Sequence, residues 1–430
     1  MRKALVIVGV VLILLGVSGC TKDGLVVWSF TDELGEMING TGSNPVSLYY
    51  KKAFPDAKIR YSMTPTEQFP SRLDPVLQSG RGAPDVFALE SAFVRKYVES
   101  GHLLDITDVY ERNKSKLLDY PVQVGSYEGK VYAMSWQAAP GAFFYRRSLA
   151  TKYLGTDDPA TVQTYFTDLN KFLETASLLK GKSDGVCVVV SSLGDLQFPF
   201  YSARQDPWVV NGRLVIDPVL NQYMDIAKTL HDNRWEGRVG QWSEGWAAGM
   251  NGSLRDESGN PVEVFGYFLP TWGLHYVLKN NATNASTGVT TAGDWAMVPG
   301  PVPYRWGGTW VGAWKGTKNP EQAKQLIEWV TTNDDFLTAW ALEKGDLVSN
   351  MDVVNRIKDD FREEFLGGQN HYAEFAEMAL EVNGRLTQGT DDDIQALFQE
   401  ALNAFVNGEK TRDQALADFR QQVQSQLGLN

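Results

Sequence analysis

The stretch "LVVWSFTDELGEMI", residues 25–38, begins with an apolar run and turns polar at Ser29. This order predicts a buried strand followed by a helix. Ser29-x-x-Asp32 is also a capping pattern, so we interpret Ser29 as the helix cap. In open α/β sheets, ligands bind beyond the carboxyl ends of strands, which makes Ser29, Phe30, Asp32 and Glu33 candidate ligand contacts.

Further along the chain, short apolar strands keep alternating with amphipathic helices. The strand "PDVFAL", residues 84–89, precedes a predicted helix over residues 91–101, and the buried strand "GVCVVVSS", residues 185–192, follows a predicted helix over residues 162–179. This alternation favours parallel or mostly parallel sheets covered by helices on both faces. With 43% hydrophobic residues, the chain is long enough for two α/β lobes.

The first twenty residues read as a secretory signal rather than as part of the fold. Arg2 and Lys3 precede an apolar run over residues 4–17, and two small residues stand before Cys20. The run is shorter than the ~20 apolar residues that a permanent membrane-spanning helix needs. The only other cysteine, Cys187, has apolar neighbours and is interpreted as a buried small hydrophobe, so no disulfide framework is expected.

Composition excludes one class of partner and favours another. Without Arg2 and Lys3, 38 basic residues (40 − 2) face 52 acidic ones, a net charge of −14. Such a chain is a poor match for nucleic acid, whose phosphates need a basic face. The 13 tryptophans are more informative, because Trp242 and Trp306 stand in polar, glycine-containing segments that indicate an exposed aromatic surface.

Several segments, taken in order, resemble the extracellular solute-binding proteins of ABC importers, specifically the sugar-binding cluster that includes maltose-binding proteins. "VSGC", residues 17–20, resembles the lipobox of bacterial lipoproteins. The other matching segments are "GAPDVFALESAFVRKYVESGHLLDITD" (82–108), "EGKVYAMSWQAAPGAFFYRRSLATKYLG" (128–155) and "GDWAMVPGPVPYRWGGTWVGAWKGTKNPEQAKQLIEWVT" (293–331). The last is the most specific, because a Gly-Gly turn, a strand, a Lys-Asn-Pro-Glu cap and a helix follow in the family's order.

The resemblance implies a two-lobed, type II-like α/β periplasmic-binding fold with a ligand cleft at the hinge. It implies an N-terminal lobe of residues 20–132 plus 311–348 and a C-terminal lobe of residues 133–310 plus 349–430, with hinge crossings near residues 131–135 and 306–311. It further implies a monomer anchored outside the cytoplasmic membrane by lipid on Cys20, which delivers a carbohydrate to an ABC permease without cofactor or catalysis.

A sugar site is expected to combine hydrogen-bonding side chains with aromatic rings that pack on the sugar. Glu90 and Ser91 fit because they end an apolar strand, and Gly308 belongs to a Gly-Gly turn where backbone can approach a ligand. The remaining candidates are aromatic residues near the crossings or the expected cleft: Trp136, Tyr145, Trp242, Trp272 and Trp310. The aspartates at 391–393 are interpreted as a helix start rather than a metal site.

Two alternatives remain open from the residues alone. A secreted glycosidase also uses acidic residues and tryptophans, although no acid and nucleophile pair can be assigned and the four histidines are scattered. The same fold could instead bind a polyamine, a peptide or another small solute. The abundance of tryptophan favours a sugar.

Overall fold

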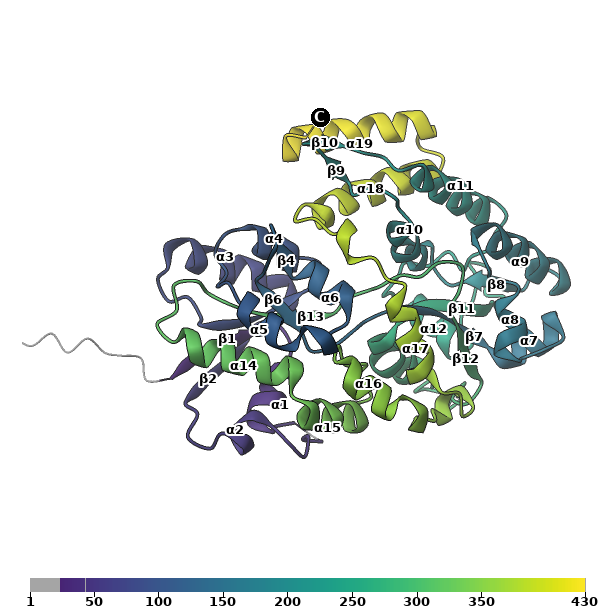
Figure 1. The fold of residues 1–430 in the computed structure, drawn as a ribbon. Coiled ribbons are helices and arrows are strands. Elements are labelled where there is room, and N and C mark those ends of the chain that lie inside the picture. Colours follow the sequence, from purple (N-terminus) through teal and green to yellow (C-terminus); the bar gives the residue numbers. More distant parts are fainter. Residues whose placement is uncertain (1–23, 43, 430) are drawn as a thin grey trace, which may run out of the picture.

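The computed structural model describes residues 24–42 and 44–429, which form two lobes (Figure 1). Each lobe has one main β-sheet with helices packed around it, so the expected two-lobed α/β fold is confirmed. The expected signal peptide, residues 1–19, and Cys20 lie outside the described residues. Within the described part of the chain, none of the helices has both the length and the apolar character needed to cross a bilayer.

The sheet of the first lobe has five strands in the order β2-β1-β3-β13-β6. They are β1 (Leu25–Ser29), β2 (Ile59–Met63), β3 (Val86–Glu90), β6 (Ala133–Ser135) and β13 (Thr309–Ala313). β1 is parallel to β2 and β3, whereas β13 is antiparallel to β3 and β6. In this register Thr309 pairs with Glu90, so the end of β3 and the start of β13 meet at one sheet edge.

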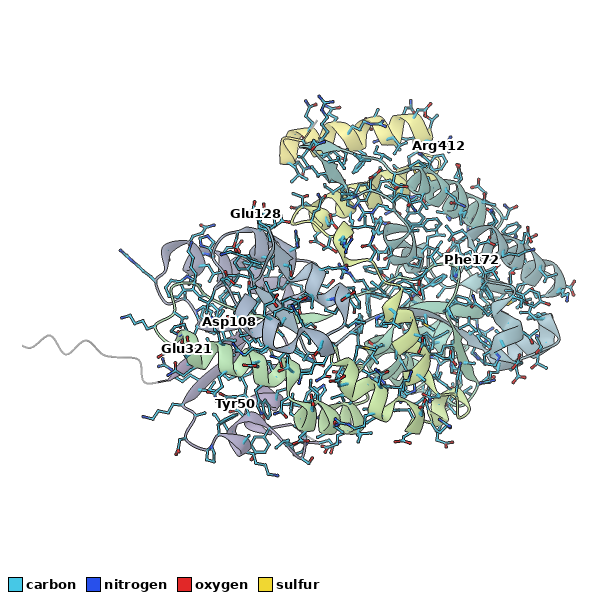
Figure 2. All side chains as sticks on the ribbon, in the orientation of Figure 1. Tyr50, Asp108, Glu128, Phe172, Glu321 and Arg412 are labelled. Atoms are coloured by element: carbon cyan, nitrogen blue, oxygen red, sulfur yellow. The ribbon has the colours of Figure 1, made fainter. Side chains whose placement is uncertain are left out.

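Helices of the first lobe come from two separate parts of the chain. They are α1 (Glu33–Asn39), α2 (Tyr50–Ala53), α3 (Phe69–Ser79), α4 (Val94–Glu99), α5 (Thr107–Asn113), α6 (Asp119–Val124), α14 (Pro320–Thr332) and α15 (Asp334–Lys344). The strand and helix predicted at residues 25–38 are confirmed as β1 and α1. Asp108 and Glu321 lie on the surface of this lobe (Figure 2).

The second lobe has a four-stranded sheet in the order β12-β7-β11-β8. Its strands are β7 (Gly141–Arg146), β8 (Cys187–Val190), β11 (Glu263–Pro270) and β12 (Trp295–Val298). Only β11 and β8 pair in parallel, so the expected mostly parallel sheet is wrong for this lobe. The central strand β7 enters directly from the first lobe and runs antiparallel to both of its neighbours.

Helices pack around this second sheet. They are α7 (Arg147–Leu154), α8 (Pro159–Gln163), α9 (Leu169–Lys182), α10 (Gln197–Ser202), α11 (Pro218–Asp232), α12 (Glu244–Met250), the π-helix η4 (Gly273–Leu278) and α13 (Lys279–Asn281). Phe172 of α9 is fully buried inside the lobe (Figure 2). The predicted buried strand around Cys187 is confirmed as β8, with all four of its residues buried.

The C-terminal part of the chain is helical. Its helices are α16 (Met351–Ile357), α17 (His371–Leu380), α18 (Asp391–Val406) and α19 (Arg412–Leu427). α18 and α19 pack together along the upper edge of the second lobe, beside α11 (Figure 1). The segment that leads into α18 therefore lies close to the space between the lobes.

Three segments of the chain connect the lobes, around residues 136–140, 304–308 and 346–350. They lie side by side, because the Trp306 amide donates to the Ala139 carbonyl at 3.1 Å and the Ala138 amide donates to the Leu347 carbonyl at 2.7 Å. The Ser349 amide likewise donates to the Trp136 carbonyl at 2.9 Å. Ala133–Ser135, which the family resemblance predicts to be in the second lobe, pairs with β13 in the first sheet.

Candidate ligand-binding site

A cavity of about 360 Å³ lies between the lobes, next to the connecting segments. The first lobe contributes Glu90, Ser91 and Ala92, which follow β3. The connecting segment contributes Arg305, Trp306 and Gly307. The second lobe contributes residues of α10, the loop before α18, and α18 itself, among them Gln197, Phe198, Tyr201, Arg204, Asn383, Thr387, Asp391, Asp392, Gln395 and Gln399. The cavity wall is therefore mixed, with charged, amide and aromatic side chains.

Glu90 and Ser91 lie where the sequence predicts a contact, at the sheet edge that faces the second lobe. A Glu90 side-chain oxygen accepts a 2.6 Å hydrogen bond from the Ala92 amide. Burial raises the pKa of Glu90 to about 7, and Arg305 partly opposes that rise. The carboxyl therefore titrates near neutral pH, and it can accept or donate a hydrogen bond at the cavity.

Arg305 links the two sides of the cavity. Its Nη1 donates to Ser91 Oγ at 2.6 Å and its Nη2 donates to Thr387 Oγ1 at 2.8 Å. Ser91 belongs to the first lobe, whereas Thr387 precedes α18 in the second. A planar guanidinium suits this role, because its donors point in fixed directions.

A second arginine and an aspartate lie deeper in the same wall. Arg204 is 5% exposed and Asp391 is 8% exposed, and their nearest charged atoms are 3.8 Å apart. Arg204 Nη1 and Asp391 Oδ1 have no hydrogen-bond partner within the described chain. Burial raises the pKa of Asp391 to about 6, with Arg204 opposing it. The helix start expected at residues 391–393 is confirmed, but Asp391 and Asp392 also line the cavity.

Two aromatic rings, Phe198 of the second lobe and Trp306 of the connecting segment, line the cavity. Phe198 stacks on Trp306 with ring centroids 4.4 Å apart, and Trp272 contacts Trp306 edge-on at 5.3 Å. Trp272 Nε1 donates to the Trp306 carbonyl at 2.8 Å. Gly307 permits this approach, since a Cβ at that position would lie 2.6 Å from the Trp272 ring nitrogen. The Gly-Gly turn therefore holds two indole rings together.

Trp242 extends this aromatic cluster beyond the residues that line the cavity, and it is exposed. Its ring lies 5.6 Å from Trp306 and is nearly parallel to that of Trp272 at 6.3 Å. The side chain is 56% exposed and its backbone φ is +66°. A bulky residue in that region carries a strain of order 1–3 kcal/mol. Trp246, by contrast, is buried, so only one ring of the predicted pair is open to a ligand.

Ser29, the last residue of β1, and the residues that follow it lie outside this cavity. Ser29 is fully buried, and its Oγ donates to the Thr31 carbonyl at 2.7 Å instead of capping a helix. The predicted Ser29 cap is wrong, because α1 begins at Glu33 after Asp32, whose side chain makes no capping bond. Phe30 contacts Phe69 and Phe93 at 6.0 Å in each case.

Asp32 and Glu33 differ in their surroundings although they are adjacent. Asp32 is exposed, whereas burial and the nearby Asp346 raise the pKa of Glu33 to about 8. Thr31 Oγ1 donates to Glu33 Oε2 at 3.3 Å. Neither residue lines the cavity described above.

Three other predicted aromatic contacts are core residues. Tyr145 is fully buried and its hydroxyl donates to the Asp157 carbonyl at 2.7 Å. Trp310 is 1% exposed and its indole donates to the Pro121 carbonyl at 2.8 Å, behind the first sheet. Trp136 is fully buried in the connecting segment. These three side chains pack against the interior, so we do not assign them to the site.

Gly308 shapes the cavity edge through its backbone. Its φ of +113° suits only glycine, and its carbonyl accepts from the Ser91 amide at 3.1 Å. This bond ties the loop after β3 to the Gly-Gly turn. Gly308 therefore positions Ser91 next to Arg305.

Sequence reasoning missed most of the second-lobe wall. Arg305 stands directly before Trp306 in a polar, aromatic segment, which was a usable signal. Gln197, Thr387 and Gln399 carry no local pattern that marks a site. In the described residues, no group of three or more His, Cys, Asp or Glu side chains is arranged to hold a metal ion.

With this geometry in place, comparison with known proteins defines the class. The model of the family described as bacterial extracellular solute-binding protein matches residues 29–335, which is more than half of the chain, so the protein belongs to that family. This is a family of substrate-binding transport proteins rather than of enzymes, and it is located outside the cytoplasm.

Solved structures show the same fold. A protein described as extracellular solute-binding protein family 1 superposes with a TM-score of 0.78 at 19% identity, covering 92% of this chain and 97% of that one. The sugar-binding protein MalE of Xanthomonas citri gives 0.73 at 14% identity, covering 94% and 96%. An ABC transporter-associated binding protein of B. animalis subsp. lactis, in complex with beta-1,6-galactobiose, gives 0.66 at 20% identity, covering 93% and 96%.

Proposed function

We propose that this protein captures a carbohydrate between its two lobes and delivers it to an ABC permease. The observation that carries the proposal is a cavity lined by Phe198 and Trp306 together with Glu90, Ser91 and Arg305. The rings of Trp242 and Trp272 pack beside Trp306. Apolar faces of a sugar ring pack on indole, and its hydroxyls pair with carboxylate and hydroxyl groups. This choice is supported by two structurally similar proteins, one in complex with beta-1,6-galactobiose and one described as a sugar-binding protein.

The proposed ligand contacts differ from the set predicted from sequence. We retain Glu90, Ser91, Trp242 and Trp272, and we add Arg305 and Trp306 from the cavity wall. Ser29, Phe30, Asp32 and Glu33 stay as candidates for an extension of the cleft beside α1. Gly308 is retained for its backbone role.

We propose lobe boundaries that follow the three connecting segments. The first lobe then ends near Ser135 rather than at residue 132, because β6 pairs with β13. It resumes at β13 and α14–α15 and ends again near residue 346. Closure about these segments would bury a ligand from solvent, as hinge motions do in two-lobed binding proteins.

We also propose that Cys20 carries the lipid anchor and that the mature protein is a monomer. The motif "VSGC" at residues 17–20 supports the first point. A Cys20→Ala variant expressed in a bacterial cell should lose incorporation of labelled palmitate and leave the membrane fraction. Retention of label would place the lipid elsewhere.

A thermal-shift screen tests the function. A ligand that binds only the folded state stabilises by RT ln(1 + [L]/Kd), which is about 2.7 kcal/mol at a hundredfold excess over Kd. We expect a raised Tm with at least one sugar of a panel that contains glucose, maltose and beta-1,6-galactobiose. Stabilisation by spermidine or a peptide, with none by any sugar, would contradict the substrate class. Release of shorter products from the oligosaccharides would contradict the assignment as a receptor.

A further inference from the structure

The loop that carries Trp242 is held in an unusual conformation. Both Arg238 and Trp242 have positive φ, at +57° and +66°. Such angles persist in bulky residues only where the surroundings fix them. Because the Trp242 ring is more than half exposed, packing around the ring alone does not supply that constraint.

One buried carboxyl group hydrogen-bonds to the residue before Trp242 and to Trp246, four residues after it. Asp195 Oδ1 accepts from Gln241 Nε2 at 3.0 Å and from Trp246 Nε1 at 2.8 Å. Gln241 in turn accepts a 3.1 Å hydrogen bond from Gln197, which lines the cavity. The Trp242 segment is therefore tied to the cavity wall and to the core through the same group.

A buried aspartate at position 195 is energetically unfavourable if its only role is to fill space. It is fully buried, and its Oδ2 has no hydrogen-bond partner within the described chain. Its burial raises its pKa to about 7, with the bonds from Trp246 and Gln241 opposing the rise and the charge of Glu236 adding to it. Burying a carboxyl without a cation is unfavourable, so an apolar residue would suit a purely structural position better.

We propose that Asp195 is a positioning residue that holds Trp242 beside Trp272 and Trp306, so that the aromatic platform is formed before the ligand arrives. This inference rests on the proposed carbohydrate-binding function. Its physical basis is preorganisation, since a ring fixed in its bound orientation loses less freedom on binding.

Fluorine NMR of fluorotryptophan-labelled, ligand-free protein tests the positioning without any sugar. The Trp242 resonance is identified as the one that disappears in Trp242→Phe. In Asp195→Ala we expect this resonance to shift and change width, because the loop is released. Thr291→Ala is the matched control: Thr291 is buried in the same lobe and accepts from the Trp295 indole at 2.9 Å, so its removal should move the Trp295 resonance and leave that of Trp242 in place.

Calorimetric titration with beta-1,6-galactobiose, or with whichever sugar of the panel gives the largest thermal shift, measures the consequence. Asp195→Ala should bind roughly tenfold more weakly, because binding would then have to order the released Trp242 loop. Thr291→Ala should bind as the parent does. Gln241→Ala removes one of the two links at a partly exposed position, and it serves if Asp195→Ala does not fold.

The outcomes separate the two proposals. An unchanged Trp242 resonance in folded Asp195→Ala, or in Gln241→Ala when the former does not fold, overturns the positioning role. A changed resonance with unchanged affinity also overturns it, because the platform would then not depend on the loop. If no sugar binds the parent protein, the carbohydrate function fails, and the NMR comparison alone still decides whether Asp195 holds Trp242.

Discussion

The two walls of the cavity are built in different ways. The first lobe presents Glu90 and Ser91 at the end of a parallel strand, where backbone geometry places side chains at the sheet edge. The second lobe presents Phe198 from a short helix, and the exposed Trp242 lies beside Trp306 on a loop. Hydrogen bonds and ring contacts hold these side chains in place. A strand end therefore positions a polar contact with little support, whereas an aromatic wall depends on a network behind it.

Truncating the aromatic wall should have the largest effect on sugar affinity. Trp306→Ala removes the ring that contacts Phe198, Trp272 and Trp242, so it should weaken sugar binding by about 2.5 kcal/mol, the range of an interface hot spot. Leu380→Ala, which removes an apolar side chain that is 57% exposed on α17, is the control and should leave affinity unchanged. Comparable losses in the two variants would contradict the assignment of the wall. Calorimetry measures both.

The carboxyl group of Glu90 in the first-lobe wall should affect folding stability as well as sugar affinity. The pKa of Glu90 is raised from 4.5 to about 7, so the folded state holds this proton more tightly than the unfolded state does. The tightly held proton of Glu90 contributes most to the free energy of unfolding below pH 4.5, and this contribution is lost as the pH rises to about 7.

Glu90→Gln removes this pH dependence. The variant should gain about 3 kcal/mol in free energy of unfolding relative to the parent between pH 4.5 and pH 8, as judged by chemical denaturation at each pH. Parallel stability curves for the two proteins over this range would show that Glu90 titrates normally and is not buried against the cavity.

Replacing Arg305, which links the two walls, should have an intermediate effect on sugar affinity. Arg305→Lys keeps the charge but cannot reach Ser91 and Thr387 in the same fork geometry, so affinity should fall by about 1.4 kcal/mol. Arg112→Lys is the control, because Arg112 also bridges two partners, Asp108 and Glu328, but on the outer surface of the first lobe. Full affinity in Arg305→Lys would indicate that charge alone is needed at the cavity.

The region after β1 should have the smallest effect. Asp32 is exposed and lies outside the cavity, so Asp32→Asn should change affinity by less than about 0.5 kcal/mol, the usual range for surface substitutions. Glu33→Gln tests the adjacent, partly buried carboxyl group. A tenfold loss in either variant would extend the binding cleft to α1 and make the first-lobe wall longer than the cavity described here.

The difference between strand ends and side chains held by tertiary contacts explains which site residues could be predicted from sequence. Strand ends follow from short apolar runs, so β1, β3 and the positions of Glu90 and Ser91 were accessible to pattern reasoning. Residue type also drew attention to Trp242 and Trp306, because they stand in polar, glycine-containing segments, whereas Trp272 was predicted from its place after an apolar strand.

The remaining site residues depend on tertiary structure. Thr387 and Asp391 reach the cavity only because α18 packs against α11 across a sequence separation of more than a hundred residues. Tyr145 and Trp310 resembled cleft residues by position, but strand pleating turns their side chains into the core. Local sequence patterns show neither how α18 packs against α11 nor which way an individual side chain points.

If a carbohydrate binds against the indole rings between the lobes, removing two of these rings should abolish binding. The measurement is a calorimetric titration of the parent and of a Trp242→Ala/Trp306→Ala double variant with the sugar that most raises the Tm of the parent. We expect one site per chain in the parent and no measurable binding heat in the folded double variant. Equal affinity in the two proteins would contradict this expectation and place the ligand elsewhere.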